Sequence, residues 1–168
     1  MAYDFLVWLF GGGITTLIAF LPIQLSYQNN ELLIDARLSN PITSETRKLV
    51  SKGFIFRIDY NCTVIINDAK TFERTTSNSV SFNGSQWMVN ERPVQEQNMQ
   101  EALGKVQFNF SKFRFDDGDE MVVYIKASIM PDSVFTSSTG LRTGILWNYY
   151  EPRFKNKFIF RSGTFVKQ

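Results

Sequence analysis

The stretch FIFRIDYNCTVII, residues 54–66, decides the fold, because apolar and polar side chains alternate along it. One parity is apolar throughout and comprises Phe54, Phe56, Ile58, Tyr60, Cys62, Val64 and Ile66. The other parity includes Arg57, Asp59, Asn61 and Thr63. Side chains of a strand point alternately to the two faces of a sheet, whereas a helical period would not separate these residues. The stretch predicts a long strand with one buried face, on which Cys62 is an unreactive thiol.

The residues before this strand predict a second strand and a helix. Residues 31–38 alternate in the same way, which is typical of a half-buried strand. Asn40-Pro41 then predicts a helix start, with Asn40 as the cap and Pro41 in the first turn. Gly53 is the expected end of that helix.

The residues after the long strand predict mostly antiparallel strands. Residues 67–78 are polar, and the pattern assigns no strand to them. Asn83-Gly84 predicts a type I′ hairpin turn, and Arg92-Pro93 predicts the start of a second helix. Further strands are expected at 106–110, with a bulge near Ser111-Lys112, and at 121–129, 145–150 and 157–166; residues 131–144 resemble a loop. This order predicts an α+β fold: a mainly antiparallel sheet or sandwich with two short helices.

Composition excludes several classes of function. The 168 residues fit one domain, and 43% of them are hydrophobic, which is enough for a sizeable core. The absence of histidine excludes Ser-His-Asp catalysis and His-ligated zinc. The single cysteine excludes an intrachain disulfide and a cysteine-cluster metal site. A net charge of +2 provides no broad positive field for nucleic acid, so we expect no nucleic-acid partner. We also expect no metal and no cofactor.

The N-terminus contains an uncharged segment, Phe5 to Leu25, which as a helix would span about 31 Å. We therefore expect residues 1–28 to be a signal peptide or membrane anchor and residues 29–168 to be a single β-rich domain. No basic residue precedes the segment and no small-x-small cleavage site follows it, which favours a retained helical anchor. An N-terminal hydrophobic segment followed by one domain predicts export to the periplasm. The first basic residue, Arg37, follows the segment, so the cytoplasmic face is the alternative.

The C-terminal region interleaves aromatic and basic side chains, a combination common in interfaces. We expect partner contacts from Trp147, Tyr149, Tyr150, Arg153, Lys155 and Lys157, with Trp147 and at least one tyrosine exposed. The alternative is that these residues only complete a strand and the core.

Two further patterns are better explained by structure than by chemistry. Residues 116–120, DDGDE, could supply oxygen ligands to calcium, but they lack the spacing of an EF-hand and fit a hairpin turn. Lys52-Gly53-Phe54 and Phe56 partly match the RNA-binding strand of the RRM family, but their aromatic side chains belong to the apolar face described above.

The pattern of residues 32–38, the following helix, Gly53, the long strand to Ile66 and the strand at 122–129 resembles an uncharacterised family of exported bacterial proteins. The resemblance implies export and no particular activity. The leading hypothesis is a non-enzymatic interaction or scaffold domain at the outer face of a bacterial inner membrane. The alternatives are a binding module for lipid or another apolar ligand and, third, a hydrolase that uses only Asp and Glu.

Overall fold

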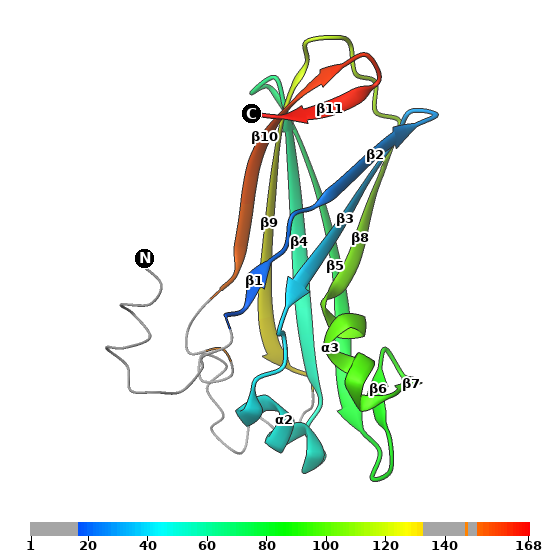
Figure 1. Cartoon of the computed structure of the whole chain (residues 1–168), viewed down its shortest axis with the longest axis vertical. Coiled ribbons are helices and arrows are strands. Elements are labelled where there is room, and N and C mark those ends of the chain that lie inside the picture. The colour runs from blue at the N-terminus through cyan, green and yellow to red at the C-terminus, as the bar shows by residue number, and fades with distance from the viewer. Residues whose placement is uncertain (1–16, 133–146, 148–150) are drawn as a thin grey trace, which may run out of the picture.

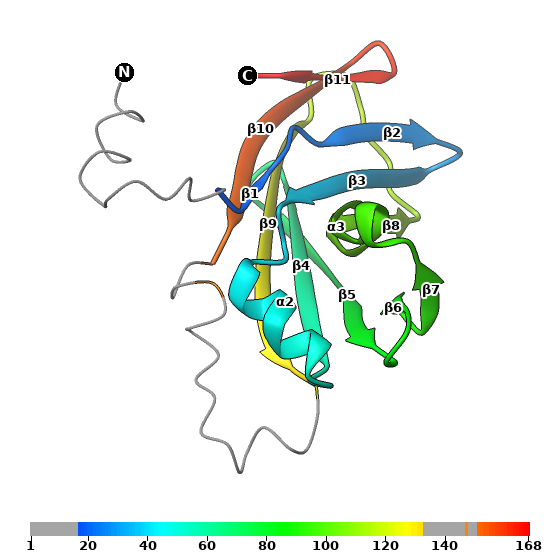
Figure 2. The same cartoon turned by 60° about the horizontal axis from the view of Figure 1, so that its bottom comes forward.

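The computed structural model describes residues 17–132, 147 and 151–168. Within them the chain forms two antiparallel sheets and two short helices, so the predicted α+β class is confirmed. The two sheets lie one in front of the other, and both helices lie at one end of the long strands (Figure 1). Turning the molecule shows that the strands of the two sheets cross at an angle (Figure 2).

The larger sheet is built around β4 (Phe56–Ile66), the strand predicted from the alternating stretch. Its seven strands run in the order β11-β10-β9-β4-β5-β6-β7. The other six are β5 (Lys70–Phe82), β6 (Trp87–Val89), β7 (Arg92–Val94), β9 (Glu120–Pro131), β10 (Arg153–Arg161) and β11 (Thr164–Lys167). β4 pairs with β9 and β5 along its whole length, so both of its edges are satisfied.

The smaller sheet is built around β3 (Glu31–Ser39). On one side β3 pairs with β8 (Lys105–Ser111), and on the other with β1 (Ala19–Phe20) and β2 (Gln24–Gln28). The helices are α2 (Ser44–Ser51), between β3 and β4, and α3 (Glu96–Gly104), which leads into β8. The facing surfaces of the two sheets form one apolar core.

The core contains every second residue of the central strands. Phe56, Ile58, Tyr60, Cys62, Val64 and Ile66 of β4 are all buried, as the sequence predicts. The corresponding residues of β9, from Met121 to Ile129, are buried in the same way. Burial raises the pKa of the Cys62 thiol to about 12, which suits an inert side chain.

The helix predicted to end at Leu25 does not reach that residue. Its first part, residues 5–16, lies outside the described residues, but β1 and β2 are strands of the smaller sheet and pair with β3. Residues 17–28 thus belong to the same β-rich fold as the residues that follow. The uncharged run concealed this because Ile18 and Phe20 face the core on one parity, and Ile23 and Leu25 on the other.

The sequence assigned three other segments wrongly. The polar residues 67–78 include most of β5, whose first half is exposed on both faces and is held by its backbone pairing with β4. Arg92 and Pro93 lie in β7 rather than in a helix, and α3 begins at Glu96. The segment 157–166 is a hairpin of β10 and β11, because Ser162 and Gly163 both have positive φ and reverse the chain.

Local geometry also corrects the expected caps and turns. Thr43, not Asn40, caps α2, and its Oγ1 accepts a hydrogen bond from the Thr46 amide at 3.2 Å. Asn40 has φ +51°, which a helix cap does not adopt. Gly53 ends the helix as predicted, with φ +95°. The Asn83-Gly84 hairpin is present, but four residues separate its closing pair, so the turn is not the predicted type I′.

The bulge expected after β8 is also present, and it moves the buried residues from even-numbered to odd-numbered positions. Lys112 has φ +66°, and the chain beyond it places Phe113 and Phe115 in the core. The predicted turn at residues 116–119 is formed, with the Asp119 amide donating to the Asp116 carbonyl at 3.0 Å. The predicted loop over 131–144 and strand over 145–150 fall almost entirely outside the described residues.

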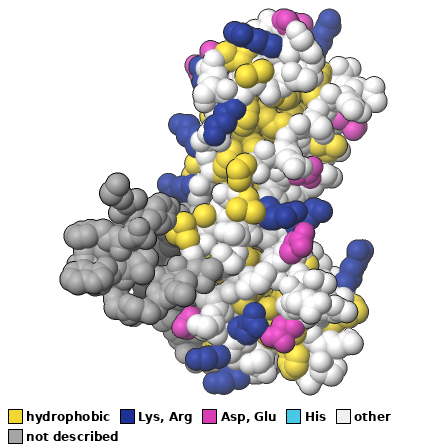
Figure 3. Space-filling model, in the orientation of Figure 1, with side chains coloured by type: hydrophobic (Ala, Val, Ile, Leu, Met, Phe, Trp, Pro, Cys, Tyr) yellow, Lys and Arg dark blue, Asp and Glu magenta, His cyan; other side chains and the backbone are white. Residues whose placement is uncertain are grey.

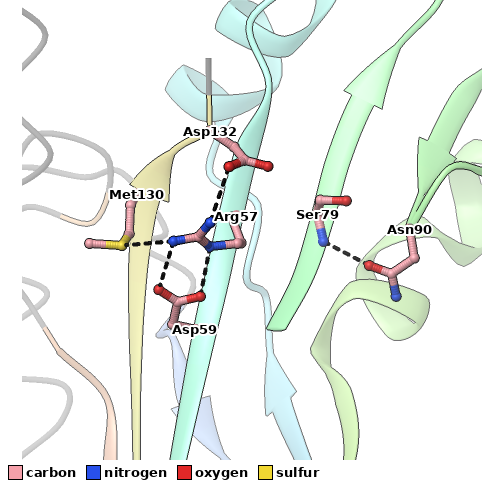
Figure 4. Close-up of polar contacts among 6 residues, drawn as sticks. All are labelled: Arg57, Asp59, Ser79, Asn90, Met130 and Asp132. Carbon is pink, nitrogen blue, oxygen red and sulfur yellow. Dashed lines mark hydrogen bonds and ion pairs between the residues drawn. The ribbon is translucent and has the colours of Figure 1, made fainter. Parts of the chain in front are cut away.

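Buried polar groups join the two sheets near the end of α3. The Tyr60 hydroxyl and the Asn78 amide both donate to the Leu103 carbonyl, at 2.8 and 2.9 Å. Asn90 donates to Asn78 and accepts from the Ser79 amide at 2.8 Å, the second contact shown in Figure 4. Gly104 follows at once, and a Cβ there would lie 2.2 Å from the Leu38 carbonyl oxygen. Only glycine therefore fits where α3 becomes β8.

Replacing Ile58 with alanine should lower the free energy of unfolding by about 2–5 kcal/mol, because Ile58 is fully buried in a close-packed core. Ser128→Ala is the matched control, since Ser128 lies opposite Asp59 on the outer face of β9. Urea unfolding followed by circular dichroism measures both changes. Equal midpoints for Ile58→Ala and the wild type would contradict the assigned face of β4.

Candidate functional site

Among the six residues for which we expected partner contacts, the structure separates Trp147 from the three basic residues. Arg153, Lys155 and Lys157 lie on the outer face of β10, because alternate residues of this strand turn toward the core. Trp147 is only 3% exposed, and its indole Nε1 donates to the Pro41 carbonyl at 2.9 Å. The expectation that Trp147 is exposed is therefore wrong. Tyr149 and Tyr150 lie outside the described residues.

The three basic residues of β10 face a row of side chains from β9. Lys126 lies opposite Arg153, Tyr124 opposite Lys155, and Val122 opposite Lys157. We call Lys126, Arg153, Lys155 and Lys157, together with Tyr124 between them, the basic strip. Sequence reasoning missed Lys126 and Tyr124, although both alternate with buried residues of a correctly predicted strand.

The cations of the basic strip outnumber the carboxylates that contact them. Lys126 and Arg153 share Glu151, at 2.9 and 3.5 Å, and Lys157 pairs with Glu120 at 2.7 Å. Lys155 has no carboxylate within ion-pair distance among the described residues. Four cations thus face two carboxylates, and the strip carries excess positive charge.

The position of Glu151 between two cations lowers the pKa of its carboxyl group. Its pKa is lowered mainly by the hydrogen bond from Lys126, with smaller contributions from the charge of Lys126 and from Arg153. The carboxyl group is therefore held in its charged form. A carboxyl group that acts as a general acid needs a raised pKa, so Glu151 is suited to charge pairing and not to proton donation.

The backbone of β10 is unpaired along part of one edge in the part of the chain that the structure describes. The Ala127 amide donates to the Pro152 carbonyl and the Phe160 amide to the Asp119 carbonyl, so even-numbered residues of β10 bond to β9. The odd-numbered residues turn their amides and carbonyls to the other edge. There β11 covers β10 only from Lys157 onward, since the Gln168 amide donates to the Lys157 carbonyl. The outward amides and carbonyls of Arg153 and Lys155 therefore have no backbone partner among residues 17–132, 147 and 151–168.

A second charged cluster lies on the outer face where β4 begins (Figure 4). Arg57 binds Asp59 through two nitrogens, at 2.8 and 3.3 Å, and Asp132 through a third, at 3.1 Å. The hydrogen bond and charge of Asp59 raise the pKa of Arg57. Each carboxylate is paired with the guanidinium, so the arrangement fixes the start of β4 against the end of β9. It does not resemble a carboxylate pair that shares a proton.

The acidic residues 116–120 serve the turn that was predicted for them. Asp119 accepts from the Asn67 side chain and from the Asp116 amide, each at 2.8 Å, and its pKa is lowered, chiefly by the bond from Asn67. Asp117 accepts from the Ser162 amide at 2.8 Å and so links the turn to the β10–β11 hairpin. Within residues 17–132, 147 and 151–168, no three acidic or cysteine side chains are grouped as a metal site requires.

Comparison with known proteins adds no assignment: no family model, curated protein or solved structure matches the chain. The resemblance to exported bacterial proteins therefore stays a prediction. Neither α2 nor α3, the helices that the structure describes, has the length and apolar character needed to cross a membrane. The basic strip and the free edge of β10 are the features on which a function can be argued.

The Glu151 carboxyl group should titrate below the ordinary glutamate value of 4.5. Lys126→Met should move the midpoint back toward 4.5, because it removes the largest stabilising contact of the charged form. Lys155→Met is the matched control and should leave the midpoint in place, because Lys155 does not contact Glu151. An NMR titration of the side-chain carboxyl carbon reads all three, and an equal upward shift in both variants would contradict the assigned pairing.

Proposed function

We propose that this protein is a non-enzymatic interaction domain, and that it binds an extended acidic segment of a partner protein along the free edge of β10. The observation that carries the proposal is the coincidence of two features in the same few residues. Arg153 and Lys155 offer unpaired backbone groups, and their side chains belong to the basic strip.

Strand addition explains how the two features act together. An incoming strand hydrogen-bonds to the free amides and carbonyls of an edge, which supplies affinity without regard to sequence. Its side chains on the outer face then lie beside Arg153 and Lys155, about 5 Å away across the ladder. Acidic residues at alternate positions would neutralise the excess charge of the strip, and Lys155 would gain its first carboxylate partner.

The proposed location is the outer face of a bacterial inner membrane, with residues before Leu17 as the attachment, since residues 17–28 belong to the smaller sheet. The support is the uncharged, largely apolar sequence of residues 5–16 and the lack of a cleavage site after the uncharged run. Leu17 and Leu21 add to this, because their side chains are 49% and 42% exposed. An apolar N-terminal rim of this kind suits a domain held close to a bilayer. The cytoplasmic face remains the alternative orientation.

A second candidate function, binding of a lipid or another apolar ligand, is favoured by one observation. Hydrophobic side chains gather on the upper half of the face shown in Figure 3, where β2 crosses in front of the larger sheet. Ile23, Leu25 and Phe154 are only partly buried against the core. The hollow at Asp35, Arg37 and Lys105 has a mainly polar lining, however, and the one beside Phe82, Trp87 and Glu96 has a mixed lining, so this candidate ranks second.

Lys155→Pro tests the proposed function at the backbone. Proline removes the outward amide and leaves the bonds to β9 intact, so the fold should survive while strand addition fails. Lys155→Ala is the matched control, because it removes the charge and keeps the amide. A synthetic peptide of alternating Glu and Val, followed by fluorescence anisotropy with the full-length protein in neutral detergent, should bind the wild type in a salt-dependent manner. We expect a loss of tenfold or more with Lys155→Pro and a smaller loss with Lys155→Ala.

Lys155→Glu provides an independent check if the proline variant is unstable. It keeps the amide and reverses the charge, so it should weaken binding of the Glu-Val peptide and allow binding of a Lys-Val peptide. Equal binding of both peptides by the wild type, or unchanged binding by the proline and glutamate variants, would overturn the proposal.

A further inference from the structure

The smaller sheet has a bulge where β1 passes into β2. Ala19 pairs with Ser39, and Gln24 pairs with Asp35. The segment that joins β1 to β2 therefore has one more residue between these two pairs than β3 has. Pro22 lies in this bulge and has no amide to donate. The chain bows outward there, and a hollow of about 510 Å³ opens on the outer face of the sheet, lined by Leu21, Pro22 and Gln24 on one side.

The other side of this hollow brings two cations together. Arg37 on β3 and Lys105 on β8 are direct cross-strand partners, and both line the hollow. The β2–β3 hairpin closes on the pair Gln28 and Glu31, so the backbone groups of odd-numbered β3 residues point toward β2. The backbone groups of Arg37 therefore point away from β8, and its pair with Lys105 is of the non-hydrogen-bonded kind. Side chains at such positions are at their closest, and like charges directly opposite one another are destabilising.

The neighbouring carboxylates compensate this pair only in part. Arg37 Nη2 lies 3.4 Å from Glu101 Oε1. Asp35, also in the lining, accepts a hydrogen bond from Gln107 Nε2 at 2.8 Å. Lys105 has no carboxylate within ion-pair distance in the part of the chain that the structure describes. The hollow thus contains an unmatched ammonium beside a guanidinium, with the amide of Gln24 at its edge.

We propose that this hollow binds a phosphate group, carried by a free phosphate compound or by a phospholipid headgroup. A phosphate between Arg37 and Lys105 would replace their mutual repulsion with two charge-assisted contacts, one from the guanidinium of Arg37 and one from the ammonium of Lys105. Leu21 and Pro22 would cover the uncharged side of the ligand. A headgroup is a natural source, because Leu21 is exposed at the rim and belongs to the uncharged run from Phe5 to Leu25. The site is remote in sequence from the edge of β10 and does not depend on it.

The first test uses the full-length protein in a neutral detergent and measures the melting temperature as inorganic phosphate replaces chloride at constant ionic strength. A ligand that binds only the folded state raises this temperature. We expect a rise for the wild type, and no rise for Lys105→Gln or Arg37→Gln. Lys167→Gln is the matched control, since it removes one exposed positive charge from β11 and should keep the response. Lys105→Gln alone should melt no lower than the wild type, because it relieves repulsion.

The second arm adds phosphatidylglycerol to the micelles, with an uncharged glycolipid, which has no phosphate group, as the comparison. Stabilisation by phosphatidylglycerol that Lys105→Gln abolishes, without a response to inorganic phosphate, identifies a headgroup as the source. A response to inorganic phosphate identifies a free anion. If neither ligand stabilises the wild type, or if Lys105→Gln and Lys167→Gln respond alike, the proposal is overturned. Should Arg37→Gln fail to fold, Lys105→Gln decides the outcome.

Discussion

The pairing of β4 with β9 is the constraint on which the rest of the structure depends. The two strands are hydrogen-bonded from Phe56 opposite Pro131 to Ile66 opposite Met121, and they bury alternate residues on the same side. A shift of one residue in this register would turn the apolar face of one of the two strands to water. The register therefore fixes which face of the larger sheet is covered by the smaller one, and which face is left to interact.

The candidate surface follows from that register. Because β9 buries Met121, Val123 and Ile125, it must expose Val122, Tyr124 and Lys126. β10 pairs with β9 so that its outward-facing basic residues lie directly beside these three residues. The β10–β11 hairpin is anchored by Asp117 and Phe160, and β11 is too short to cover the beginning of β10. The proposed binding edge thus arises from the unequal lengths of two strands, and the basic side chains along it discourage pairing with a second copy of the chain.

The sequence predicted what depends on alternation and could not predict what depends on backbone pairing. β3, β4 and β9 were found because one face of each is buried, and this leaves a period of two in the residues. β5 was missed because residues 70–75 are exposed on both faces and are placed chiefly by backbone pairing with β4. The uncharged run at the N-terminus was read as one helix because its bulge changes the parity between Phe20 and Ile23, which disguises two short strands.

The candidate site was predictable only in part, for similar reasons. The basic residues of β10 were identified from composition, but the burial of Trp147 depends on the Pro41 carbonyl, a residue more than a hundred positions away. The free edge, and the opposition of Arg37 and Lys105, exist only once strands are paired. Residue types alone contain no signal for them.

Amide hydrogen exchange tests the central claim most directly, because it reads the edge of β10 one residue at a time. In the free protein the amides of Phe154 and Asn156 should be protected by β9, while the amide of Lys155 exchanges at a rate typical of an unbonded group. Addition of the alternating Glu-Val peptide should slow exchange at Lys155 and leave its two neighbours unchanged. An amide of Lys155 that is already protected in the free protein, or one that the peptide does not slow, would contradict the account.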